Sequence, residues 1–294
     1  MQITDLHWTI LNEENRKAHQ LMENVLKAEE PDLVIFTGDI IHVENCMSPV
    51  DSFLQATKAV RDSGIPWSIV FGNHDALDET AYISLLNAQL DSITCLTEQG
   101  PRDIHGFSNY SLPIYANDSD QIGAAVICLD SGSYAPSEIG GADWIKADQI
   151  QWFREECSRI KQYASSPTLP PTLAFFHIPL PEYLHMWTNQ VCYGDKFENV
   201  GSSKVNSGLF AAMLQEENVI GVFVGHDHVN DFQGKLYGIR LCYGRLTGYN
   251  SYGKEGMLKG VRMIQLRENA SSFDSWIRLE DGSIITLQDE HRPE

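Results

Sequence analysis

Five short apolar runs, separated by longer amphipathic stretches, constrain the fold of this 294-residue chain more than any other feature. Each is four to six residues long and is followed within two positions by glycine, aspartate or histidine: Leu33–Phe36, Trp67–Phe71, Ala124–Leu129, Leu173–Phe176 and Val219–Val224. Continuous apolar runs of this length are typical of strands that are buried on both faces. The chain is therefore predicted to fold as an α/β protein.

The stretches between these runs carry helical patterns. In Asn12–Glu30, five apolar residues fall on one stripe, as in an amphipathic helix. Similar patterns predict helices over Val50–Ser63, Glu79–Leu90, Asp143–Ala164 and Ser207–Glu217. A first strand of about four residues is expected at Met1–Thr4, which is at the short end for strands. Ile178–Asn206 has no clear period and is predicted to be an irregular loop that faces a substrate, or else a plain surface loop. The segment 231–280 is predicted to be rich in strands, without a helix.

The charge and the cysteines exclude several classes of protein. Forty Asp and Glu residues against 21 Lys and Arg give a net charge of −19, which repels nucleic acids and anionic membranes. The longest apolar runs are far below the length of a membrane span. Six cysteines without a C-x-x-C pair argue against a zinc knuckle and favour the cytoplasm. A secreted or periplasmic location would require a leader removed before Met1.

Polar residues stand where the apolar runs stop. In chain order they are Asp5-Leu6-His7, Gly38-Asp39, Gly72-Asn73-His74-Asp75, His177 and Gly225-His226-Asp227-His228. Since α/β sheets place their sites beyond the carboxyl ends of strands, these sets are expected to converge. Two residues at i and i+2 of an extended segment point to one face, which is the expected arrangement of Asp5 with His7 and of His226 with His228.

The donor chemistry of these sets indicates a metal site. Two Asp, four His and one Asn, without Cys, suit Mn, Fe, Zn, Co or Ni better than Ca. Seven ligands are too many for one tetrahedral ion and fit two ions that share a carboxylate. Two ions about 3.5–4 Å apart stabilise both the attacking and the leaving oxygen of a phosphoryl group.

The order D-x-H, G-D, G-N-H-D, H, G-H-D-H, which spans Asp5 to His228, resembles the calcineurin-like metallophosphoesterase family. The resemblance implies a single domain over residues 1–294, folded as a four-layer αββα sandwich of two mixed β-sheets flanked by helices. It also implies two divalent ions, with Mn, Fe or Zn favoured. Asp5, His7 and His228 would bind the first ion, Asn73, His177 and His226 the second, and Asp39 both. His74 would contact the phosphate and protonate the leaving oxygen.

Three further segments, Phe176–Tyr183, His226–Asp231 and Tyr243–Tyr249, are similar to purple-acid-phosphatase-like proteins of plants and fungi. True purple acid phosphatases carry a tyrosine three residues after the bridging aspartate, where this chain has His42. The resemblance therefore implies a colourless divalent pair and no tyrosinate on iron.

The resemblance implies a hydrolase that attacks phosphate esters with a metal-bound hydroxide. Monoesterase activity is favoured, with phosphodiesterase activity on a cyclic nucleotide or other small diester as the alternative and a non-catalytic metal-binding scaffold as the remote one. A nuclease is disfavoured by the charge, and a protein Ser/Thr phosphatase by G-N-H-D in place of G-N-H-E.

The expected partner is a small phosphoester, and the oligomeric state stays open. Arg245 and Tyr183 are candidate substrate contacts, although Arg245 equally fits a surface ion pair. His42, His105 and His185 are further candidates without a motif.

Overall fold

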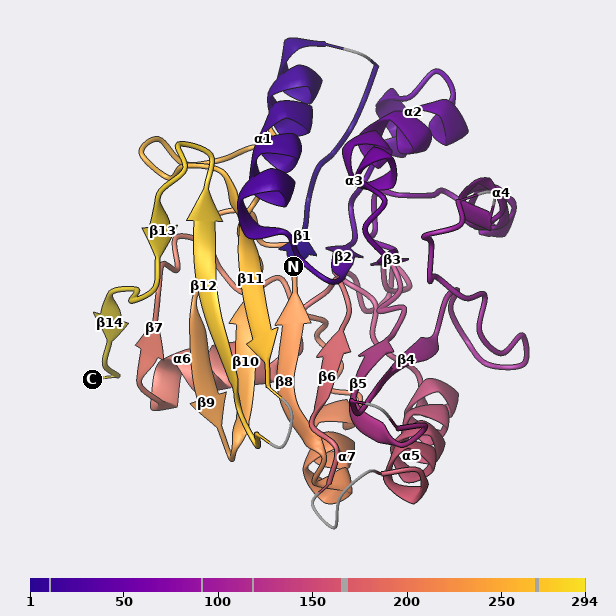
Figure 1. Ribbon diagram of the computed structural model, residues 1–294, viewed down its shortest axis with the longest axis vertical. Coiled ribbons are helices and arrows are strands. Elements are labelled where there is room, and N and C mark those ends of the chain that lie inside the picture. The colour runs from indigo at the N-terminus through magenta and orange to yellow at the C-terminus, as the bar shows by residue number, and fades with distance from the viewer. Residues whose placement is uncertain (11, 91, 118, 165–168, 268–269, 294) are drawn as a thin grey trace.

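Two mixed β-sheets lie face to face between two groups of helices, which is the predicted four-layer arrangement (Figure 1). The computed structural model describes residues 1–10, 12–90, 92–117, 119–164, 169–267 and 270–293. None of the helices in these ranges is both long and apolar enough to cross a membrane.

The first sheet has the strand order β13-β12-β11-β1-β2-β3. Its parallel part consists of β1 (Gln2–Ile3), β2 (Val34–Thr37) and β3 (Trp67–Val70), and β11 (Gly260–Leu266), β12 (Phe273–Leu279) and β13 (Ile284–Ile285) add antiparallel strands. The helical segments that follow the parallel strands are α1 (Glu13–Glu29), η1 (Val43–Asn45), α2 (Pro49–Ala56), α3 (Lys58–Ser63) and α4 (Glu79–Leu90). The apolar stripe of α1 packs on this sheet as predicted.

The second sheet has the order β14-β7-β9-β10-β8-β6-β5-β4. Its central strands β5 (Ile122–Cys128), β6 (Thr172–Phe175), β8 (Val219–Val224) and β10 (Ile239–Tyr243) are parallel, and β4 (Tyr110–Tyr115) and β9 (Gln233–Leu236) pair antiparallel on either side of them. The outer strands are β7 (Cys192–Tyr193) and β14 (Glu290–His291). Its helices are α5 (Ala147–Gln162), α6 (Glu182–Asn189) and α7 (Leu209–Glu216).

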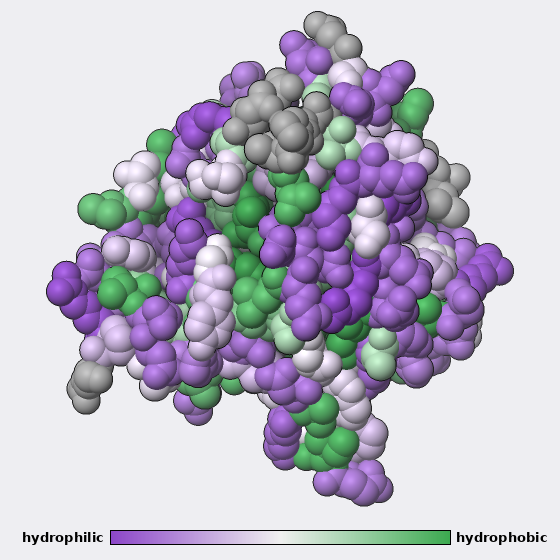
Figure 2. All heavy atoms as spheres, turned by 90° about the horizontal axis from the view of Figure 1, so that it is seen from below, coloured by the Kyte–Doolittle hydropathy of each residue, from purple (hydrophilic) through white to green (hydrophobic). Residues whose placement is uncertain are grey.

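A cluster of apolar side chains fills the space between the two sheets, in addition to the apolar clusters under the helices of each sheet. Ile35 and Val70 of the first sheet face Val126, Phe175 and Phe223 of the second. A groove of about 430 Å³ enters this space between Ile35, Val126 and Trp276. Seen from below, the surface is largely hydrophilic, with apolar side chains in a hollow near its centre (Figure 2). Because apolar side chains cover both faces of β2, β5, β6 and β8, these strands have the continuous apolar sequences from which they were predicted.

Three sequence predictions need correction. The single helix predicted over Val50–Ser63 is two helices, α2 and α3, separated at Thr57, whose hydroxyl donates to the Phe53 carbonyl (2.9 Å). The first strand has two residues instead of four. Ile178–Asn206 is not wholly irregular, because it contains α6 and β7. The helix α6 has eight residues and buries only two of them, Tyr183 and Met186. Two buried positions are too few to show a helical period in the sequence.

The topology positions the site. The parallel strands β1, β2, β3, β6 and β8 all end at the same edge of the sandwich, and the predicted polar sets follow these ends directly.

Candidate metal centre

Tight left-handed turns follow the strands at this edge. Asp5, His7, Asp39 and His226 have φ of 55°, 46°, 50° and 75°, a region that non-glycine residues rarely occupy. Such residues cluster at functional sites, where the surrounding structure offsets their strain. The extended i, i+2 geometry predicted for Asp5 with His7 and for His226 with His228 is therefore wrong, since Asp5, His7 and His226 have a left-handed backbone.

Glycines allow the loops to approach one another. A Cβ atom on Gly38 (φ 86°) would lie 2.4 Å from His177 Nδ1, and one on Gly72 would lie 2.2 Å from Asp39 Oδ1. Any side chain at these two positions would displace the polar residues beside it.

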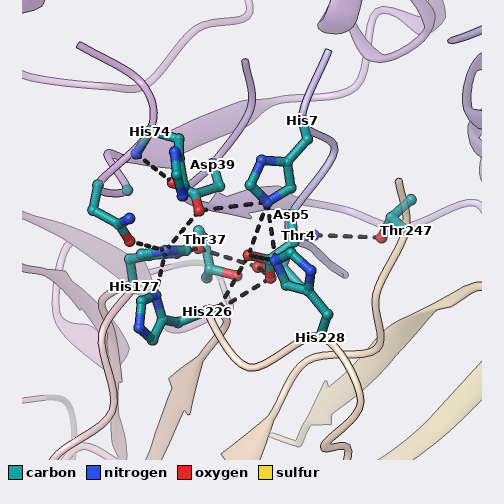
Figure 3. Close-up of polar contacts among 12 residues, drawn as sticks. Thr4, Asp5, His7, Thr37, Asp39, His74, His177, His226, His228 and Thr247 are labelled. Atoms are coloured by element: carbon teal, nitrogen blue, oxygen red, sulfur yellow. Dashed lines mark hydrogen bonds and ion pairs between the residues drawn. The ribbon is translucent and has the colours of Figure 1, made fainter. Parts of the chain in front are cut away.

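The seven predicted donors come together in two groups that share one residue (Figure 3). Asp5, His7, Asp39 and His228 form the first group. Asp39, His177 and His226 form the second, and the Asn73 Oδ1 atom joins it at 3.1 Å from His177 Nε2. His226 and His228 thus belong to different groups.

One oxygen of Asp39 lies between the two groups. Asp39 Oδ2 is 3.5 Å from His7 Nε2 and 3.2 Å from His177 Nε2. The other oxygen, Oδ1, accepts a hydrogen bond from the His74 backbone N–H (2.8 Å), which fixes the orientation of the carboxylate. In the first group, the facing Nε2 atoms of His7 and His228 are 3.0 Å apart. Asp39 Oδ2 is therefore placed to serve both groups.

Neighbouring groups orient the donors inward. His177 Nδ1 faces the Thr37 carbonyl (2.8 Å), which leaves Nε2 to point at Asp39. His228 Nδ1 faces the Tyr252 carbonyl in the same way (3.3 Å). Partners of this kind fix the tautomer of a metal-ligating histidine. Thr4 donates its hydroxyl to Asp5 Oδ2 (2.7 Å), and its backbone N–H is held by Thr247. The donors therefore fit a divalent metal by type and by orientation.

The electrostatics agree with this fit. Burial would raise the pKa of Asp39, but the neighbouring histidines, His177 before His7 and His74, together outweigh burial and hold the pKa well below the usual range. Burial would lower the pKa of His177, but Asp39 raises it to about 10. Burial lowers the pKa of His7 and of His226 to about 4, so both rings are neutral at pH 7, as a ligand must be, whereas His177 would give up its proton when a metal binds. The buried carboxylates of Asp5 and Asp39 are stabilised by positive charge nearby, and a divalent cation would provide that charge.

His74 lies beside the donors and is not one of them. Its half-buried ring is 5.2 Å from the His7 ring and 4.6 Å from the His42 ring, between centroids. Burial lowers the pKa of His74 below its ordinary value. The ring is thus held at the edge of the cluster by the hydrogen bond from its own backbone to Asp39.

The two predicted substrate contacts are wrong. Tyr183 is completely buried, and its hydroxyl contacts the Val222 and Cys242 carbonyls (3.1 and 3.2 Å), so no substrate reaches it. Arg245 is also buried, where it pairs with Asp231 (2.5 Å) and donates to the Leu258 carbonyl (2.7 Å). It is therefore not a surface ion pair, and its guanidinium is already engaged by protein acceptors.

The remaining candidate histidines differ in position. His42 lies against His74 and is about one quarter exposed. His105 pairs with Asp148 (2.7 Å), and His185 lies on α6 beside Asn189. Only His42 contacts the residues of the metal centre, at 5.6 Å between its ring centroid and that of His7.

Several residues that support the site were not predicted from the sequence. Asp75 accepts the backbone N–H groups of Ile41 (3.0 Å) and Gly72 (2.7 Å), which ties together the two loops that carry Asp39 and Asn73. The G-N-H-D motif contained this aspartate, but its role depends on a tertiary contact. Two tyrosines, Tyr134 and Tyr252, contact donors from loops that carry no motif.

The corrected place of Arg245 gives a stability prediction. In Arg245→Ala, Asp231 remains buried without its partner, so we expect a loss of about 3–5 kcal/mol in the free energy of unfolding, measured with urea. The matched control is Arg267→Ala, which removes an exposed ion pair with Asp274 and is expected to cost less than about 1 kcal/mol. Equal losses in the two variants would contradict the buried pair.

The fold and this site define a metal-dependent phosphoesterase class, and comparison with known proteins assigns the family. The calcineurin-like phosphoesterase family (Metallophos) matches residues 1–230, and the chain belongs to it. Probable inactive purple acid phosphatase 29 of Arabidopsis thaliana is 35% identical over 289 residues, which cover 90% of this chain and 74% of that protein. Phosphatase DCR2 of Saccharomyces cerevisiae is 31% identical over 289 residues, which cover 90% of this chain and 48% of that one.

A solved structure shows the same fold. The crystal structure of a dimetal phosphatase from Danio rerio aligns with a TM-score of 0.60 over 98% of each chain, at 15% sequence identity. This structure confirms the fold, and the Arabidopsis relative confirms the similarity to purple-acid-phosphatase-like proteins.

His42 leads to a spectroscopic prediction. Because a histidine replaces the tyrosine of purple acid phosphatases, the metal-loaded protein is expected to show no intense violet band in its visible absorption spectrum. Such a band would contradict the prediction. Its disappearance in Tyr134→Phe would identify that phenol, which contacts Asn73, as the source.

Proposed function

We propose that this protein is a phosphoesterase that depends on two divalent metal ions and hydrolyses phosphate monoesters. The observation that carries the proposal is the position of Asp39, whose Oδ2 atom faces both groups of donors. A shared carboxylate oxygen is the feature that distinguishes a two-metal site from two separate sites.

The chain offers a complete set of ligands. Asp5, His7 and His228 would hold one ion and Asn73, His177 and His226 the other, with Asp39 shared. When bound, two such ions stabilise the charge on a phosphoryl group and lower the pKa of a water nucleophile. Manganese, iron or zinc suits this mixture of imidazole and carboxylate ligands.

His74 is the proposed general acid. Its ring lies beside the first group, and its backbone is fixed to Asp39, so the imidazole is held next to an ester that would bind at the ions. An alkoxide leaves poorly without a proton, and a positioned acid typically contributes about 10²–10⁴-fold.

Two other functions are alternatives. A phosphodiesterase would use the same ligands on a small diester. A scaffold without activity is suggested by the name of the Arabidopsis relative, which is called probable inactive, whereas the yeast relative is called a phosphatase. The presence of all seven donors together with His74 favours an enzyme. The net charge of −19 favours a small phosphoester over a nucleic acid.

Initial rates on p-nitrophenyl phosphate and bis-p-nitrophenyl phosphate test the proposal. With Mn²⁺ we expect the monoester to be hydrolysed, and the diester to be hydrolysed more slowly or not at all. We expect EDTA to abolish the turnover completely. A faster rate on the diester would select the phosphodiesterase. An absence of turnover in protein that carries its metals, as shown by elemental analysis, would support the scaffold instead.

A further inference from the structure

Two exposed tyrosines contact the metal donors from outside. Tyr252, in the loop between β10 and β11, is 56% exposed, and Tyr134, in the loop between β5 and α5, is 64% exposed. Asn73 and His228, which they contact, are themselves less than 7% exposed and belong to different donor groups. Each tyrosine therefore joins a buried donor of one group to an exposed ring.

Tyr252 is fixed against His228. The two rings stack, with centroids 4.1 Å apart and 22° between their planes. The Tyr252 hydroxyl donates to Glu198 Oε2 (2.8 Å), and Glu198 Oε1 is held by the Val229 N–H (2.8 Å). Phe197, next to Glu198 in the chain, is 48% exposed, and the Lys254 ammonium lies 4.3 Å from its ring centroid.

Tyr134 is fixed against Asn73. Its hydroxyl accepts a hydrogen bond from Asn73 Nδ2 (3.2 Å), and the neighbouring Ser133 hydroxyl donates to the Asn73 carbonyl (3.3 Å). A bridge between Tyr134 and Ala142 closes the loop on itself. The ring thus has a defined place, although most of it is in solvent.

Anchored, exposed aromatic rings are suited to bind other rings. A side chain that is already held loses little conformational freedom on binding, and ring faces and edges attract a planar aromatic partner more than an alkyl chain. The phosphoryl group of a ligand would bind at the metal centre and not on these rings. The part of a ligand that meets them is the group attached to phosphorus.

We propose, building on the phosphoesterase function above, that Tyr134 and Tyr252 form an aromatic entrance to the metal centre. This entrance selects phosphoryl compounds that carry a planar aromatic group close to phosphorus. An aryl ester and a nucleotide share this chemistry, and the experiment below includes both.

The test measures binding, so that it does not depend on turnover. The affinities of benzylphosphonate and n-butylphosphonate for the Mn²⁺-loaded protein are compared by calorimetry. We expect the aromatic ligand to bind about 3- to 10-fold more tightly. We expect Tyr134→Leu and Tyr252→Leu each to reduce this ratio, because they weaken the binding of benzylphosphonate more than that of n-butylphosphonate. A nucleoside 5′-phosphonate, tested next, shows whether a base is accepted as well as a phenyl ring.

Matched variants separate the rings from their anchors. Tyr134→Phe and Tyr252→Phe lose the hydrogen bonds to Asn73 and Glu198 but keep the rings, so they are expected to retain most of the preference. Tyr115→Leu, at an exposed tyrosine on the far end of β4, is expected to change neither affinity. A leucine variant that weakens both ligands equally would assign the tyrosine a merely structural role.

The outcomes distinguish this inference from the proposed function. Equal affinities for the two phosphonates in the wild-type protein would overturn the aromatic entrance, even if esters are hydrolysed. A preference for the aromatic ligand without hydrolysis of any ester would contradict the proposed phosphoesterase function but would support the aromatic entrance. Failure of the metal-loaded protein to bind either phosphonate would overturn both.

Discussion

Asp39→Asn is expected to remove both metal ions from the protein. Because Asp39 Oδ1 accepts the His74 N–H, the amide oxygen of the variant stays on that side. The amide NH₂ then takes the place of Oδ2 and points its hydrogens at His7 and His177. We expect the affinity for Mn²⁺ to fall by more than the roughly 10–100-fold that follows loss of an outer hydrogen-bond partner. Calorimetry and elemental analysis after gel filtration measure it.

Asparagine is the suitable substitution at this position. Asp39 has φ of 50°, a conformation that asparagine adopts more readily than alanine, so the variant is expected to fold, as circular dichroism would verify. The matched control is Asp5→Asn, since Asp5 belongs to the first group only and its loss is expected to spare the second ion. An Asp39→Asn protein that retains two ions per chain would refute the shared oxygen.

Much of this centre could be predicted from the sequence because its signals are local. The strands β2, β3, β5, β6 and β8 are buried on both faces, so their apolar character shows in the sequence without knowledge of their partners. The donors stand directly after β1, β2, β3, β6 and β8, and parallel strands end at the same edge. The position of each donor in the sequence was therefore enough to predict that the donors meet at one edge of the sandwich.

The errors concern residues whose surroundings come from distant parts of the chain. Arg245 looked like a loop cation, but its partner Asp231 lies on the other side of the β9–β10 hairpin, which no local pattern reveals. Tyr183 was placed in a loop because α6 is too short to show a helical period. Tyr252 meets His228 from a loop 24 residues further along the chain. Such contacts depend on tertiary packing.

The left-handed turns were missed for a related reason. Asp and His tolerate positive φ less readily than glycine, so the sequence D-x-H reads as an extended pair. In the structure, backbone N–H groups of one loop bind carbonyls of the next, for example Asp5 N to Gly38 O (3.1 Å) and His7 N to Asp39 O (2.9 Å). These tertiary hydrogen bonds stabilise the strained residues, and the resulting turns aim both side chains at Asp39.

His74→Asn is expected to keep both ions and to lose turnover by about 10²–10⁴-fold. His74 donates only its backbone N–H to Asp39, and asparagine retains that bond, so elemental analysis should find unchanged metal content. His42→Asn is the matched control, since its ring lies 4.6 Å from that of His74 but contacts no donor by hydrogen bond among the described residues. We expect a much smaller change in kcat for this variant.

The choice of leaving group shows whether His74 donates a proton. A p-nitrophenolate ion is stable and leaves without protonation, whereas an alkoxide needs a proton as the bond to phosphorus breaks. The loss of kcat in His74→Asn should therefore be far larger for an alkyl or benzyl phosphate than for p-nitrophenyl phosphate. Equal losses on both esters would assign His74 a role in binding the phosphoryl group, and not in proton transfer. Since its ring borders the donor cluster, only this comparison separates the two roles.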